Sequence, residues 1–86
     1  MDKTDVAWLS CKVAAGMTSG EYSIELETAE GKDVSLFAPE DYVDKNKGLL
    51  RVNVLENSQN SCLVYLPSEP FEVGSRFINV PKHRMK

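Results

Sequence analysis

The stretch that decides the fold is residues 48–67, with the sequence GLLRVNVLENSQNSCLVYLP. Apolar residues alternate with other residues on both sides of the polar segment 57–60; they are Leu50, Val52 and Val54, then Cys62, Val64 and Leu66. Period-two apolar spacing around an Asn/Ser-rich loop is typical of a β-hairpin. We therefore expect two strands folded back on residues 57–60, with the rest of the chain packed against them.

Shorter segments with the same period-two pattern lie on both sides of this hairpin. We expect strands at about 6–17, 22–28, 33–38 and 76–80, with tight turns at Gly20 and Gly31. Pro39 suits the first position of one helical turn over 39–43. Pro67 and Pro70 should interrupt the sheet, because proline has no N–H to donate to a strand ladder.

The fold class predicted from these segments is all-β, as a small antiparallel barrel of five to six strands. Closure of a barrel would pair the strand edges that an open sheet of this size leaves free. The order of segments is similar to SH3-like barrels, and an OB-like barrel or a small sandwich is the alternative. This likeness concerns architecture alone and implies no function.

The 86 residues are enough for one domain with a modest core. We expect a disordered N-terminus at 1–5, a single barrel domain at 6–81 and a basic tail at 82–86. Cys11 and Cys62 should be reduced, inward-facing thiols, with a disulfide between neighbouring strands as the alternative. The predicted core consists of Leu9, Cys11, Val13, Ile24, Leu26, Val34, Leu36, Val52, Val54, Val64, Leu66 and Ile78.

Charge is unevenly distributed along the chain. The net charge is −3, yet residues 76–86 carry Arg76, Lys82, Arg84 and Lys86 without an acid, which leaves −7 for the remainder. An acidic body repels a phosphate backbone at long range, which argues against non-specific nucleic-acid binding. The polar start and the lack of a run of about 20 apolar residues predict a cytoplasmic protein without a membrane partner.

The sequence contains no catalytic or cofactor signature. His83 is the one histidine and lies in the basic tail, where a mobile side chain makes a poor general base. The Cys and His residues are too few and too far apart for structural zinc, and the glycines are scattered singly rather than forming a phosphate-binding loop. We expect no enzyme activity, no metal and no cofactor.

The hairpin and the last strand are apolar on both faces, which a sheet face in contact with water alone would not need. Two explanations remain open. Either the 67–74 loop and the 42–43 turn fold over the second face, or that face is a shallow binding patch. The residues of the second face are Leu49, Leu55, Leu63, Tyr65 and Phe77, interleaved with Arg51 and Asn79. The candidate binding residues are Arg51, Tyr65, Phe71 and Phe77, because aromatic and Arg side chains combine contact area with hydrogen bonding.

The function expected from this pattern is that of a non-catalytic module, monomeric or weakly dimeric, that binds another protein through the aromatic face. The alternative is a weak nucleic-acid-binding barrel that uses the sheet aromatics for stacking and the basic tail for phosphate. A third hypothesis is that acids around one hairpin mimic phosphate for a basic partner; they are Glu25, Glu27, Glu30 and Asp33.

Overall fold

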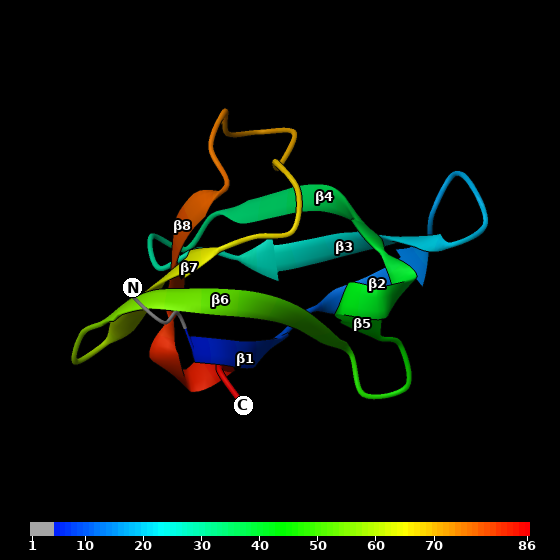
Figure 1. The fold of residues 1–86 in the computed structure, drawn as a ribbon. Helices are drawn as coiled ribbons and strands as arrows, with labels where there is room; N and C mark the ends of the chain where they lie inside the picture. Colours follow the sequence, from blue (N-terminus) through cyan, green and yellow to red (C-terminus); the bar gives the residue numbers. More distant parts are fainter. Residues whose placement is uncertain (1–4) are drawn as a thin grey trace, which may run out of the picture.

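The computed structural model describes residues 5–86, which form two antiparallel sheets packed face to face (Figure 1). The large sheet has the order β1-β6-β7-β8, and β5 pairs with β6; the small sheet has the order β2-β3-β4. The strands of the large sheet are β1 (Asp5–Ser10), β5 (Val43–Asp44), β6 (Leu49–Asn57), β7 (Ser61–Tyr65) and β8 (Phe77–Pro81). Those of the small sheet are β2 (Lys12–Ala15), β3 (Glu21–Glu27) and β4 (Asp33–Pro39).

The all-β prediction is confirmed, and the ladders of residues 5–86 form two sheets rather than one closed ring. The helical segments described are two three-residue 3₁₀ turns, η1 (Glu40–Tyr42) and η2 (Lys82–Arg84). Neither of these turns could cross a membrane. Residues 1–4 of the expected disordered N-terminus lie outside the described residues, and Asp5 already belongs to β1.

The central hairpin is confirmed as β6 and β7, closed by a bond from Ser58 N–H to Ser61 O of 2.9 Å. Its register contains a bulge that the alternation did not predict. Val54 pairs with Val64 and Glu56 pairs with Leu63, so Leu55 is an extra residue on β6. Since a bulge breaks the period of two, residues beyond Val54 do not follow the facing expected from the sequence.

The expected single strand over 6–17 is wrong, because the chain changes sheet at Cys11. β1 pairs with β6 and β2 pairs with β3. Between them, Cys11 N–H donates to Gly48 O at 2.9 Å. Gly48 has a φ of +67°, and a Cβ there would lie 3.1 Å from Cys11 O, so both its backbone angle and the close approach favour glycine. Met17, at the end of the predicted strand, is 81% exposed.

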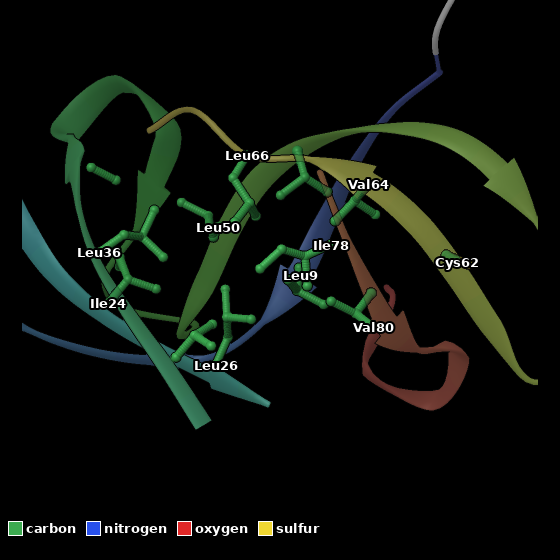
Figure 2. Close-up of a cluster of buried hydrophobic side chains, with 13 residues drawn as sticks. Leu9, Ile24, Leu26, Leu36, Leu50, Cys62, Val64, Leu66, Ile78 and Val80 are labelled. Carbon is green, nitrogen blue, oxygen red and sulfur yellow. The ribbon is translucent and has the colours of Figure 1, made fainter. Parts of the chain in front are cut away.

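The core lies between the sheets, where Ile24, Leu26 and Leu36 of the small sheet face Leu9 and Leu50 of the large one (Figure 2). Nine of the twelve predicted core residues are buried. The other three, Cys11, Val13 and Val54, are only partly buried and pack at the margin of the core. Core residues absent from the predicted set are Ala38, Leu50, Cys62 and Val80.

Both cysteines are free thiols. Cys62 is buried on β7 and its Sγ donates to Asn57 Oδ1 at 3.1 Å. Burial raises the pKa of the Cys11 thiol to about 11. The Cys11 side chain is therefore protonated at neutral pH and is a weak nucleophile.

The loop after β7 covers part of the free edge of β4 (Figure 1). Phe71 N–H donates to Ser35 O at 2.8 Å, and Ser35 N–H donates to Glu72 Oε1 at 2.7 Å. Phe71 is nevertheless 66% exposed and Val73 39% exposed, so neither side chain enters the core. The loop pairs with a strand edge, which is an alternative to barrel closure for hiding unpaired backbone groups.

The C-terminal segment covers the edge of β1. Met85 forms a bridge with Leu9, and Lys86 N–H donates to Trp8 O at 2.9 Å. The chain after β8 therefore folds back on the large sheet as η2 and one further backbone pairing.

Candidate functional site

The outer face of the large sheet, turned away from the core, carries the side chains of the candidate site. The ladders place one row of residues across four strands, and facing residues of a ladder share a sheet face. This row is Val6, Asn53, Tyr65 and Phe77. The flanking residues of these strands, including Leu9, Val52, Val64 and Ile78, point the other way and are buried.

Tyr65 and Phe77 form an aromatic pair on this face. Their ring centroids lie 4.9 Å apart with a tilt of 53°. Phe77 is 54% exposed, whereas Tyr65 is half-buried. An exposed ring held against a neighbouring ring loses little conformational freedom when a partner covers it, which is a property of strong interface residues.

Arg76 contacts both the Tyr65 ring and the base of the loop. Its guanidinium carbon lies 4.4 Å from the centroid of the Tyr65 ring. Its Nε donates to Leu66 O at 3.0 Å and one terminal nitrogen donates to Pro67 O at 2.7 Å. Leu66 N–H in turn donates to Arg76 O at 2.9 Å. Arg76 therefore fixes the Tyr65 ring and the start of the loop as one unit.

Arg51 makes a second cation–aromatic contact on the same face. Its guanidinium carbon lies 4.9 Å from the centroid of the Tyr42 ring, which η1 presents. Arg51 Nε is buried and has no hydrogen-bond partner among the described residues. A hollow of about 120 Å³ is lined by both arginines and both tyrosines, together with Val52, Asn53, Leu66 and Pro67. This lining contains two cations and no acid.

The structure brings three of the four predicted site residues together. Arg51, Tyr65 and Phe77 lie on the outer face, and Arg51 shares the hollow with Tyr65. Phe71 packs against Phe37 instead, with centroids 5.2 Å apart at 79°. Phe71 therefore belongs to a second aromatic pair, on β4 of the small sheet.

Of the two explanations left open by the sequence, coverage of the second face by the 67–74 loop does not hold for Phe77, because the loop lies along β4 and leaves that ring exposed. The 42–43 turn does approach the face, through the contact of Tyr42 with Arg51. The sequence placed the 42–43 turn near this face but did not include Tyr42 among the binding residues, and it missed Arg76. Arg76 lies before β8 in an irregular segment, where no period indicates its direction.

Further apolar side chains extend the exposed surface. Val6 at one end of the row is 55% exposed. Leu55 is 39% exposed, but it lies at the bulge, where the period of two no longer assigns a face. Trp8 is half-buried and is the ladder partner of Arg51. Apolar and aromatic groups rimmed by polar ones mark interaction surfaces more often than scattered single residues do.

The side chains of residues 5–86 do not form a metal-binding group. His83 is exposed in η2, and no three His, Cys, Asp or Glu side chains of this region lie together as a metal site would require.

Comparisons with models of known protein families, with curated proteins and with solved structures each find no match for this chain.

Proposed function

We propose that this protein is a non-catalytic interaction module that binds another protein through the outer face of the large sheet. The observation that carries the proposal is the exposed Phe77 ring, which packs on Tyr65, whose ring Arg76 also contacts. Such a preformed aromatic surface can bury apolar area on binding at little entropic cost. In this proposal the two sheets serve as a small SH3-like scaffold.

A protein partner fits this surface better than a nucleic acid does. The arginines of the face already stack on Tyr42 and Tyr65, so these ring faces are less free to stack on bases. In the basic tail, Arg84 lies 3.4 Å from Glu27, and Lys82 Nζ donates to Ser58 O at 3.0 Å. Cations that are paired within the chain add less to phosphate binding.

Phosphate mimicry by the acidic hairpin receives less support. Glu25 lies 3.8 Å from Lys12, and Glu27 lies 3.4 Å from Arg84. Two of the four acids of that hypothesis are thus near cations of the chain itself, which reduces the negative field available to a basic partner.

The proposal is tested by site-specific photocrosslinking in cells that express the protein. A photoreactive phenylalanine analogue replaces Phe77 in one variant and Met17 in a control variant. Met17 is 81% exposed and lies at the turn between β2 and β3, away from the outer face. We expect a discrete protein adduct from position 77 and none of the same mass from position 17.

Two outcomes would contradict the proposal. Adducts that are identical at both positions would show that position 77 has no preferred partner. An adduct that nuclease removes would favour the nucleic-acid alternative.

A further inference from the structure

The edges of β4 and β8 face each other across a groove of about 310 Å³. The lining includes residues 32–34 at the start of β4 and residues 77–79 of β8. Side chains alternate between the two faces of a strand, so three consecutive residues line one groove only where the strand presents its backbone edge. This groove is therefore bordered by two strand edges.

The hydrogen bonds show which backbone groups of β8 point into the groove. Asn79 O accepts from Ala29 N–H at 2.8 Å, so the backbone polar groups of Asn79 point away from β7. In an antiparallel strand the N–H and C=O of one residue point to the same side. The N–H of Asn79 therefore also points outward, and it has no acceptor among residues 5–86.

The same reasoning applies to β4. Ser35 uses both its N–H and its C=O to bond the 71–72 segment of the loop, so its backbone groups point away from β3. Asp33, two residues earlier, has its backbone groups on the same side. The N–H and C=O of Asp33 have no hydrogen-bond partner in the described part of the chain. The groove thus offers an open donor on β8, and an open donor and acceptor on β4.

The side chains of the groove suit an apolar segment with basic ends. Val34 and Ile78 are buried beneath it, while Val73 and Phe77 are 39% and 54% exposed at its sides. Its charged lining consists of three acids against one cation, namely Glu30, Asp33, Glu72 and Lys32. This imbalance favours a partner segment that carries Lys or Arg.

We propose that this groove binds an extended peptide segment by strand addition between β4 and β8, with apolar side chains flanked by Lys or Arg. In strand addition, backbone hydrogen bonds supply affinity and side-chain pockets supply specificity. The Ala29–Asn79 bond limits the open edge on one side and the Phe71–Ser35 bond limits it on the other. The docked segment is therefore short, about two to three residues. This site goes beyond the proposed function and does not require the rest of the outer face to bind anything.

The probe for this proposal is the peptide acetyl-Lys-Val-Thr-Val-Lys-amide, titrated into ¹⁵N-labelled protein. We expect saturable shifts of the Asn79 and Asp33 amide signals and slower hydrogen exchange at both. A matched peptide with the three central nitrogens methylated keeps the side chains but cannot donate. It should bind at least tenfold more weakly, and an analogue with Glu in place of both Lys should also bind at least tenfold more weakly.

Asn79→Pro removes the open donor of β8 and should weaken binding of the first peptide at least tenfold. The N–H of Asn79 does not serve the ladder with β7, so proline is compatible with this edge position. The double variant Glu30→Gln and Asp33→Asn, which leaves every strand backbone unchanged, should weaken binding of the Lys peptide and not of the Glu analogue.

Equal affinity for the methylated and unmethylated peptides would overturn strand addition. The absence of shifts at Asn79 and Asp33 would overturn the site. Neither result depends on the stability of a variant, since both are measured on the wild-type protein.

Discussion

Replacement of Arg76 by alanine removes three contacts at the base of the loop and beside the Tyr65 ring. These contacts are the bonds to Leu66 O at 3.0 Å and Pro67 O at 2.7 Å, and the stacking on Tyr65 at 4.4 Å. Hydrogen bonds from charged groups contribute about 1.5–3 kcal/mol each, and a partly exposed cation–π contact contributes about 0.5–1 kcal/mol.

The contributions do not add fully, because Arg76 is only half-buried and the loop can relax. We expect Arg76→Ala to lower the free energy of unfolding by about 2–4 kcal/mol. For a domain of this size, that loss lowers Tm by roughly 10–30 °C. Urea unfolding followed by circular dichroism measures the free energy, and a thermal scan measures Tm.

Arg76→Lys serves as the matched control, because it keeps the charge and loses the paired donors of the guanidinium. We expect it to recover less than half of the stability lost in Arg76→Ala, since the lysine ammonium cannot reach both carbonyls in the same geometry. A loss below about 0.5 kcal/mol for Arg76→Ala is typical of an ordinary surface residue. It would refute the claim that Arg76 fixes the Tyr65 ring and the start of the loop.

Three further predictions concern the fold around the site. Val64→Ala, at a fully buried position on β7, should lower the free energy of unfolding by about 2–4 kcal/mol in urea titrations, and a loss near zero would contradict the strand facing. Gly16→Ala should destabilise the protein, because a Cβ there would lie 2.6 Å from a backbone oxygen, whereas Gly74→Ala, in open space, should leave Tm within a few degrees. The bond from Ser35 N–H holds the pKa of Glu72 below its usual range, so the ionised Glu72 carboxylate stabilises the folded protein above its unfolded-state pKa. This stabilisation is lost as the pH falls through the lower folded-state pKa, and Glu72→Gln should show no such loss. Stability–pH curves that run parallel for the wild-type protein and Glu72→Gln would refute this.

The alternation in the sequence was sufficient to predict most of the core, but not where the chain changes sheet. Apolar residues continue at every second position through Cys11, so nothing in the period distinguishes β1 from β2. The change of sheet at Cys11 depends on Gly48, a residue distant in the sequence whose carbonyl accepts a hydrogen bond from the Cys11 N–H. Such a long-range bond leaves no local pattern.

The candidate site was predicted in part for a similar reason. Alternation placed Arg51, Tyr65 and Phe77 on one face, because they lie on the regular parts of β6, β7 and β8. It could not place Phe71, since loop residues have no period. The position of Phe71 depends on Ser35, whose backbone N–H and C=O are not used by β3 and instead bond the loop to β4.

The affinity of the crosslinked partner for variants at position 77 tests the central claim most directly. The partner identified by crosslinking is titrated by calorimetry against the wild-type protein, Phe77→Ala and the control Met17→Ala. If the outer face binds the partner through the exposed ring, Phe77→Ala should weaken binding at least about tenfold, or ~1.4 kcal/mol, and Met17→Ala should have no effect. Equal affinities for all three proteins, with unfolding curves that show them folded, would contradict the claim.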